Sequence, residues 1–155
     1  MKHSHLNRYR HHRYGGSKIR EKRSRYHRIK TNPLISNAHA VYGYLESYRH
    51  LDREYFIAIT LDGASRVIDA HIISIGTLNQ SLVHPREVFY PAIQDKAAAI
   101  IIAHNHPSGQ LSPSRADRQI TTRLKEVGKL IGIDIIDHII LTTEGYYSFQ
   151  DEDEI

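Results

Sequence analysis

The chain has 155 residues, enough for one domain with its own hydrophobic core and too few for an eight-stranded α/β barrel. It contains no cysteine, which excludes disulfide scaffolds, thiolate metal clusters and thiol nucleophiles. The net charge is +4, and the longest apolar run, residues 97–103, is too short to cross a bilayer. We therefore expect a cytoplasmic protein with no membrane partner.

The N-terminal segment differs sharply in charge from the rest of the chain. Up to residue 30 there are eleven Lys or Arg and one Glu, about +10, which leaves about −6 for the remainder. Few aliphatic side chains occur there, so we expect residues 1–33 to be a basic, largely disordered arm and residues 34–155 to be the folded domain. Tyrosines among the basic residues would suit nucleic acid, and the alternative is a solvated tail without a partner. The candidate nucleic-acid contacts are Arg8, Arg10, Arg13, Arg20, Lys22, Arg23, Arg25 and Arg28.

The body is expected to begin with a helix followed by two strands. Ser36 suits the N-cap of a helix whose apolar residues recur at helical spacing up to about His50. Two β-rich runs within residues 54–76 flank Asp62-Gly63, a turn-forming pair. This pattern predicts a hairpin or a close antiparallel pair.

A second helix and a buried strand are expected next. Pro85 suits the first position of a helix that continues to about Ala97. Pro91 lies inside that helix and should kink or shorten it, because proline removes a backbone hydrogen bond. The apolar run "AAIIIAH" at 98–104 then predicts a short buried strand.

The C-terminal third predicts a long helix and two more strands. Ser112-Pro113 is expected to be a cap followed by the first helical residue of an amphipathic helix over 114–132. Strands are expected within 133–143 and 146–149. The inward positions of the helix are expected to be Ile120, Leu124, Val127 and either Leu130 or Ile131. The order of elements predicts a mixed α/β sandwich, with one central sheet covered by helices.

Four residues around the buried strand form a candidate metal site. His104 and His106 lie two apart at the strand end, so both imidazoles can face the same way. Ser114 and Asp117 share a face at the start of the next helix, and the turn-rich loop can bring that face over the strand end. Two imidazoles and a carboxylate suit zinc with a water in the fourth position, which zinc acidifies to a hydroxide nucleophile. Ser114 could donate a hydrogen bond to the oxyanion of an attacked carbonyl.

The alternative is structural, with buried histidines whose nitrogens are satisfied and an ordinary polar turn. Three signals in register, the histidine pair, the reversal and the Ser-x-x-Asp, favour the metal site. Other metal-site classes do not fit, because His-Glu-x-x-His is absent and amidohydrolase barrels are longer. A metallo-β-lactamase pattern would need His and Asp where Pro107 and Ser108 stand, and HNH nucleases take their name from scattered residues.

The stretch "HNHPSGQLSPSRAD" resembles the JAMM (MPN+) zinc-hydrolase motif. That motif is His-x-His, seven residues, Ser, two residues and Asp, and it fits without a gap. Within that superfamily, the sequence over roughly residues 34–149 resembles the RadC-like proteins. The supporting stretches are "REYFIAITLD", "VHPREVF", "AAAIIIAHNHPSG", "PSRAD" and "DHIIL".

The resemblance implies a JAB1/MPN-like (cytidine-deaminase-like) fold, a mixed sheet sandwiched by helices. It implies a zinc ion held by His104, His106 and Asp117. It also implies a glutamate at the start of an early strand as general acid and base, and Glu54 matches that position. The alternative for Glu54 is an exposed strand-end carboxylate without a role, and the residues alone leave Glu46, Glu87 and Glu126 open.

Two further histidines lie in stretches that resemble the family, and neither is expected to have a functional role. His84 and His138 are interpreted as structural, at a helix entry and on a strand face. Full-length RadC proteins carry a helix-hairpin-helix segment ahead of this domain, and here the basic arm stands in its place, so DNA association is not carried over from the family.

Two functions are expected from these observations. The first is a zinc metallohydrolase that cleaves peptide or isopeptide bonds in a protein or peptide substrate by a metal-activated water. The second is a DNA-associated accessory protein of the RadC type that uses the basic arm and has a structural or vestigial metal site. The sequence leaves the oligomeric state open.

Overall fold

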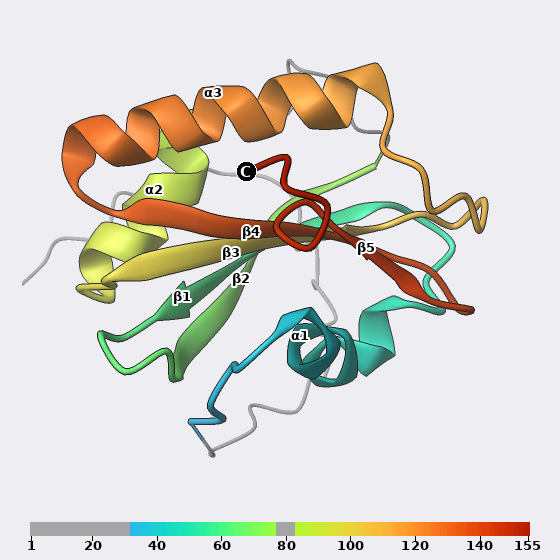
Figure 1. Ribbon diagram of the computed structural model, residues 1–155, viewed down its shortest axis with the longest axis horizontal. Coiled ribbons are helices and arrows are strands. Elements are labelled where there is room, and N and C mark those ends of the chain that lie inside the picture. The colour runs from blue at the N-terminus through green and yellow to red at the C-terminus, as the bar shows by residue number, and fades with distance from the viewer. Residues whose placement is uncertain (1–31, 77–82) are drawn as a thin grey trace, which may run out of the picture.

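A computed structural model of the chain describes residues 32–76 and 83–155. Residues 1–31 of the basic arm, which include all of its candidate nucleic-acid contacts, therefore lie outside the described residues. Within them, five strands form one mixed sheet (Figure 1). The elements in chain order are α1 (Ala38–Tyr44), the 3-10 turn η1 (Glu46–Tyr48), β1 (Tyr55–Leu61), β2 (Val67–Ile75), α2 (Pro85–Gln94), β3 (Ala99–Asn105), α3 (Arg115–Ile131), β4 (Asp134–Leu141) and β5 (Tyr146–Ser148).

The sheet has the strand order β2-β1-β3-β4-β5. β1 pairs antiparallel with both β2 and β3, and β4 pairs antiparallel with β5. β3 and β4 are parallel, and α3 is the crossover that parallel strands require. Because α3 runs back along the sheet, its first turn lies near the end of β3. The hairpin expected around Asp62-Gly63 and the mixed α/β sandwich are both confirmed.

Helices cover both faces of the sheet, α2 and α3 on one face and α1 on the other (Figure 1). The alternation of β3 divides its side chains between two cores. Ile100 and Ile102 pack in the core that contains Leu124 of α3. Ile101 packs in the core that contains Val41 of α1. Even-numbered residues of β3 therefore face α3, and odd-numbered residues face α1.

Two helix caps differ from the prediction. Asn37, not Ser36, caps α1, and its Oδ1 accepts the N–H of Ala40 at 2.9 Å. The α-helix ends at Tyr44, well before His50, and is followed only by the short 3-10 turn η1. Gly43 and the tyrosines on either side of it have low helix propensity, which accounts for the early end.

The cap of α3 is Ser114 rather than Ser112, so Pro113 precedes the helix. Ser114 has an acidic residue three positions on, Asp117, and the two form a capping box. The equivalent position for Ser112 is Arg115, which cannot return an acceptor to the cap. The second half of the box decides the start of the helix.

The second helix agrees closely with its prediction. Pro85 occupies the first turn of α2, after the N-cap His84, so the prediction that His84 is a helix-entry residue is confirmed. Pro91 lies inside the helix, which ends at Gln94, three residues before the predicted end. Lys96 has a φ of 56°, a left-handed conformation that does not continue a helix.

The inward stripe of α3 is confirmed in its first turns and wrong at its end. Ile120 and Leu124 are buried and Val127 packs partly buried against the same core, whereas Leu130 is 85% exposed and Ile131 is 44% exposed. The last inward position is Gly128, where an added Cβ would lie 2.6 Å from the carbonyl oxygen of Ile133. The helix then ends at Gly132, in the left-handed conformation, before another inward turn is completed.

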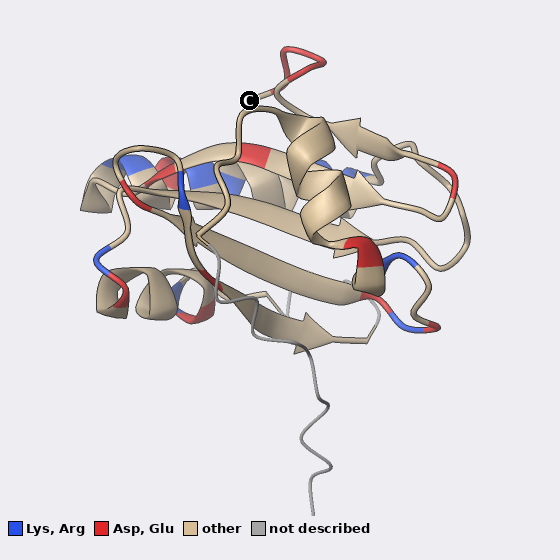
Figure 2. Cartoon of the chain, turned by 90° about the horizontal axis from the view of Figure 1, so that it is seen from below, with Lys and Arg blue, Asp and Glu red and all other residues tan. Residues whose placement is uncertain are grey.

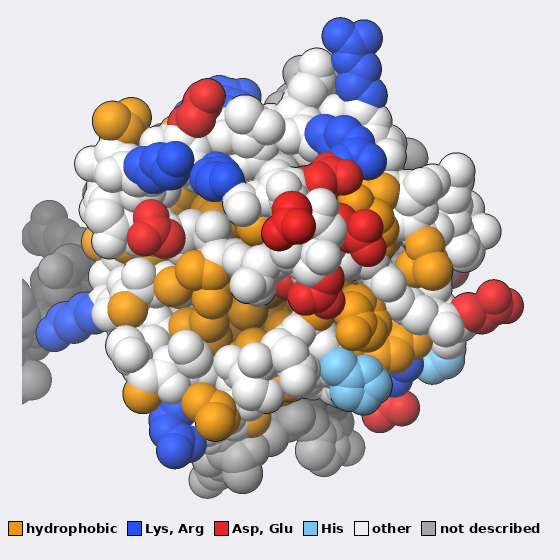
Figure 3. Space-filling view, viewed as in Figure 1, with side chains coloured by type: hydrophobic (Ala, Val, Ile, Leu, Met, Phe, Trp, Pro, Cys, Tyr) orange, Lys and Arg blue, Asp and Glu red, His pale blue; other side chains and the backbone are white. Residues whose placement is uncertain are grey.

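The β4 edge is only partly covered. β5 pairs with Ile139–Leu141 alone, so within the described chain no strand borders the first half of β4 on that side. Figure 3 shows hydrophobic side chains gathered in the middle of this side of the molecule, next to a group of Asp and Glu. Within 32–76 and 83–155, none of the helices has the length and apolar character needed to span a bilayer.

Candidate metal centre

Lys, Arg, Asp and Glu residues lie mainly on helices and loops (Figure 2), whereas a few ionisable residues are buried. Asp117, His104 and His138 are buried. These three residues come from α3, β3 and β4. A buried ionisable group is costly unless it is paired or binds a metal, so this concentration marks a site.

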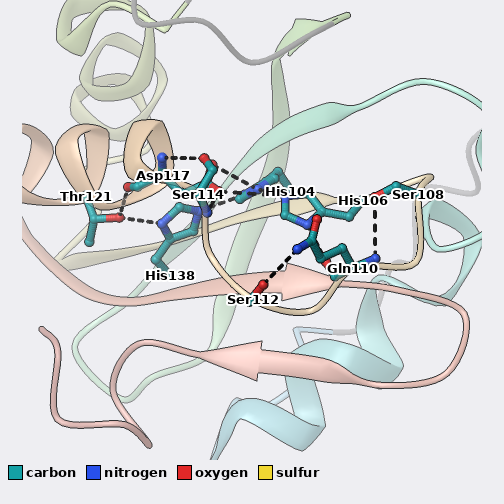
Figure 4. A network of polar contacts seen from close by, with 9 residues as sticks. All are labelled: His104, His106, Ser108, Gln110, Ser112, Ser114, Asp117, Thr121 and His138. Atoms are coloured by element: carbon teal, nitrogen blue, oxygen red, sulfur yellow. Dashed lines mark hydrogen bonds and ion pairs between the residues drawn. The ribbon is translucent and has the colours of Figure 1, made fainter.

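The three expected metal ligands come together at the end of β3 (Figure 4). His104 is even-numbered in β3 and therefore faces α3, as does His106 two residues on. Asp117 occupies the first turn of α3, above the same strand end. The alternation of the strand and the return of the crossover helix together place the three side chains on one face.

The donor atoms form a small triangle. His104 Nε2 lies 2.8 Å from His106 Nε2 and 3.2 Å from Asp117 Oδ1. His106 Nε2 lies 3.7 Å from the other carboxylate oxygen, Asp117 Oδ2, and one donor atom from each of the three residues lies within 4.8 Å of the other two. A tetrahedral zinc ion with bonds of about 2.0–2.1 Å separates its ligand atoms by about 3.3 Å. The triangle therefore has the size that a single such ion needs, and two imidazoles with one carboxylate suit zinc chemically.

The electrostatics of the site favour the protonation states of Asp117 and His104 that can bind a metal ion. Burial opposes ionisation of Asp117, but its interaction with His104 and the hydrogen bonds from Ser114 hold its pKa well below the usual range. Burial lowers the pKa of His104 against the opposing effect of Asp117. Burial also lowers the pKa of His138. These shifts favour an ionised Asp117 and a neutral His104, the forms that bind metal ions.

The second histidine has its proton placed by the backbone. His106 Nδ1 lies 2.5 Å from the carbonyl oxygen of Gln110, which can only accept. The proton of neutral His106 therefore sits on Nδ1, and Nε2 keeps its lone pair. The loop after β3 thus orients one ligand without help from another side chain.

Ser114 has a clear structural role in the site. Its Oγ accepts the N–H of Asp117 at 3.1 Å, and its own N–H donates to Asp117 Oδ2 at 2.7 Å. These bonds hold the carboxylate in place at the start of α3. The expected donation from the Ser114 hydroxyl to an oxyanion stays a prediction.

Glu54 lies immediately before β1 and is half-buried. The β1–β3 pairing ends with Phe56 opposite His104, and Glu54 and His106 each lie two residues beyond this last pair on their own segments. The alternation of an extended chain puts it on the same face as Phe56 and the two histidines. Its charge acts on His104 by raising the pKa of that imidazole, the smallest of several effects. The structure thus brings Glu54 to the site, and its catalytic role stays a prediction.

The sequence reasoning missed Asn105, the residue between the two histidines. It is fully buried and faces the opposite side of the sheet. Its Oδ1 accepts the N–H of Tyr55 at 2.7 Å, and its Nδ2 donates to the carbonyl of Arg53 at 2.8 Å. Asn105 therefore ties down the backbone on both sides of Glu54. The alternation of the strand was the available signal, because an amide in a buried strand needs partners.

His138 is a strand-face residue, as expected, but it also contacts the site. Its Nε2 lies 2.8 Å from His104 Nδ1, and its Nδ1 lies 2.5 Å from Thr121 Oγ1. The group of close metal-binding atoms does not include His138. It stands behind a ligand, and its place 34 residues away from His104 gave no local signal in the sequence.

Comparison with known proteins agrees with this geometry. The family model of the RadC-like JAB domain matches residues 35–154. The chain belongs to the RadC-like JAB domain family. A UPF0758 protein of Rubrobacter xylanophilus is 50% identical over 120 residues, which is 77% of this chain and 52% of the relative.

Two further relatives are similar at the same level. A UPF0758 protein of Thermotoga maritima is 44% identical over 115 residues, 74% of this chain and 52% of the relative. One of Clostridioides difficile is 51% identical over 108 residues, 70% of this chain and 46% of the relative. This RadC-like JAB domain protein thus spans about half the length of the curated relatives it matches. The names of these relatives state no activity.

Proposed function

We propose that this protein is a zinc-dependent hydrolase that cleaves an amide, a peptide or isopeptide bond, by a metal-activated water. The observation that carries the proposal is the cluster of donor atoms from His104, His106 and Asp117: the two imidazole Nε2 atoms lie 2.8 Å apart, and each lies 3.2–3.7 Å from one of the two carboxylate oxygens of Asp117. A bound zinc ion would supply Lewis acidity to the water and to the substrate carbonyl.

The residues around the triangle would handle the protons. Glu54 would accept a proton from the attacking water and pass it to the leaving nitrogen as the carbon–nitrogen bond breaks. The Ser114 hydroxyl would donate a hydrogen bond to the oxyanion that forms on the carbonyl. The products are a carboxylic acid and an amine, so the atoms of one water are divided between them.

The metal part of the proposal is tested by elemental analysis. We expect one zinc per wild-type chain and none in Asp117→Asn, which keeps the shape of the side chain and removes its charge. Glu126→Asn serves as the control, because Glu126 is an exposed acidic residue of the same helix. A wild-type chain that binds no zinc after refolding in its presence would rule out the metal centre.

The catalytic part is tested with Glu54→Gln in a screen of peptide and isopeptide substrates. We expect this variant to keep its zinc and to lose hydrolysis by about 10²–10⁴-fold, the usual contribution of a general acid and base. Glu87→Gln, an exposed residue of α2, is the matched control and should hydrolyse at the wild-type rate. Equal rates for Glu54→Gln and the wild type would remove Glu54 from the mechanism.

A second function is favoured by the division of charge between the arm and the folded domain. We propose that the arm binds nucleic acid through its phosphates. Replacing the basic residues of the arm at 8–28 by Gln should weaken binding to a duplex oligonucleotide and flatten its salt dependence. Replacing Arg115 and Arg123, exposed basic residues of α3, is the control and should change binding little. Unchanged binding by the arm variant would show that the arm is not the contact.

A further inference from the structure

We propose that His138 is a positioning residue of the metal centre: it fixes the proton of His104 on Nδ1 and so keeps His104 Nε2 free to bind metal. This inference rests on the metal site of the proposed function. It assigns a role to His138 and Thr121, which lie outside the motif of ligands. Figure 4 shows both residues behind the ligands, between α3 and β4.

A continuous chain of hydrogen bonds joins two of the ligand residues. His104 Nδ1 lies 2.8 Å from His138 Nε2, and His138 Nδ1 lies 2.5 Å from Thr121 Oγ1. Thr121 Oγ1 in turn lies 2.6 Å from the backbone carbonyl oxygen of Asp117. The chain starts at a ligand on β3 and ends on the backbone of a ligand residue on α3.

The donor and the acceptor of every bond follow from the last acceptor in this series of hydrogen bonds, the backbone carbonyl of Asp117. The Asp117 carbonyl can only accept, so the single hydroxyl proton of Thr121 is donated to it. Thr121 Oγ1 must then accept from His138, which places the proton of a neutral His138 on Nδ1. His138 Nε2 is left as an acceptor, and the His104 proton is drawn to Nδ1. One arrangement of protons satisfies all three bonds, and it leaves the lone pair of His104 on the atom that faces Asp117 and His106.

Packing holds the relay in place. His104 and His138 are fully buried, and Thr121 is 2% exposed. The ring of Phe149 stacks on His138, with centroids 4.7 Å apart and planes 12° apart. The ring of Phe56 meets His138 edge-on at 5.8 Å. The imidazole plane is therefore fixed, so its two nitrogens stay aimed at their partners.

The two ligand histidines differ in this respect. The proton of His106 is held by a backbone carbonyl, which no substitution of a side chain removes directly. The proton of His104 depends on the His138 side chain. Without that acceptor, the proton of a buried His104 has no partner on Nδ1, and the tautomer with hydrogen on Nε2 blocks metal binding.

The test is the dissociation constant for Zn²⁺, measured on the full chain by competition with a chelating dye, together with the absorption spectrum of the Co²⁺ form. His138→Leu and Thr121→Val should each weaken binding by about 10–100-fold, the usual effect of losing a hydrogen-bond partner of a ligand. His138→Gln offers an amide oxygen near the position of Nε2 and should recover part of the affinity. His84→Gln, at the exposed N-cap of α2, is the matched control and should bind as the wild type does.

The outcomes separate this inference from the proposed function. A wild-type chain that binds no Zn²⁺ overturns both. A wild type that binds, together with a folded His138→Leu of equal affinity and unchanged Co²⁺ spectrum, overturns the relay alone, because a purely structural residue would change only the unfolding temperature. If His138→Leu does not fold, Thr121→Val decides: it removes only a hydroxyl group at nearly constant volume, and unchanged affinity there refutes the relay.

Discussion

Asn105 shows how one side chain can serve the site from the opposite face of the sheet. It separates the two histidines in the chain, and its amide holds the backbone before and after Glu54. Removing the amide would take this partner from the part-buried N–H of Tyr55 and carbonyl of Arg53. A donor or acceptor left unsatisfied in the interior costs about 1–3 kcal/mol each.

Asn105→Ala is therefore expected to lower the free energy of unfolding by about 2–4 kcal/mol, measured by denaturant titration of the metal-free protein. Asn37→Ala is the matched control, because Asn37 also bonds a backbone N–H but at an exposed helix cap. That control should cost about 1 kcal/mol. Equal costs for the two variants would contradict the clamp around Glu54.

At the scale of residues, the sequence predicts what lies close along the chain. His104, His106 and Asp117 are found within one strand end, one loop and one helix start, where alternation and capping govern direction. His138 comes from a strand whose position depends on the whole crossover. Its contact with His104 is therefore a tertiary contact that local sequence patterns do not predict. No role was predicted for Asn105, although its burial follows from the same alternation of the strand.

At the scale of elements, α3 is set by its two ends. The capping box at Ser114 and Asp117 fixes the first turn, which carries a ligand. The close approach of Gly128 to the carbonyl oxygen of Ile133 fixes the last turns against the start of β4. The predicted length of the helix was nearly right. The predicted inward residues of its last turn were wrong, because the inward position is a glycine, and hydrophobic periodicity detects only apolar side chains.

Gly128→Ala is expected to destabilise the protein by about 1–3 kcal/mol, the usual cost of overpacking, since the new methyl group would lie 2.6 Å from a backbone oxygen. Gly43→Ala is the control in an exposed helical position with nothing within 4 Å. It should stabilise the protein by about 0.5–1 kcal/mol through helix propensity. Thermal unfolding of the two variants gives the comparison, and a neutral Gly128→Ala would mean that the end of α3 can move.

At the scale of the whole molecule, the buried imidazoles tie stability to pH. Burial lowers the pKa of both His104 and His138 in the folded state. An unfolded chain takes up protons below the ordinary histidine pKa of about 6.5, whereas the folded chain resists them. Stability is therefore complete above that pH and is lost as the pH falls. Burial raises the pKa of Asp137, which has the opposite sign, but it is one group against two.

The metal-free protein in chelator is thus expected to lose stability between about pH 6.5 and 5, by at most about 1.4 kcal/mol per pH unit for each histidine. His138→Gln removes one of the two groups, and the slope should fall by up to half. Urea titrations at several pH values measure both slopes. A flat profile for the wild type would mean that these imidazoles ionise in the folded protein as they do in water.

The overall architecture was predicted in part. The order of helices and strands follows from local patterns, and it is confirmed along the described residues. The strand order and the parallel pairing of β3 with β4 have no local signal and were not predicted, because the family resemblance implied only a mixed sheet sandwiched by helices. Pairing depends on contacts between segments far apart in the chain, which periodicity does not report.

The crossover from β3 through α3 to β4 separates two parts of the proposed site. The three side chains that could hold a metal ion and the proposed relay behind His104 belong to this single βαβ unit, whereas Glu54 precedes β1 of the neighbouring hairpin. With Glu54 as the proposed acid and base, metal binding and proton transfer would depend on separate segments of the chain. Substitutions in the hairpin would then abolish hydrolysis and leave the metal-binding unit intact.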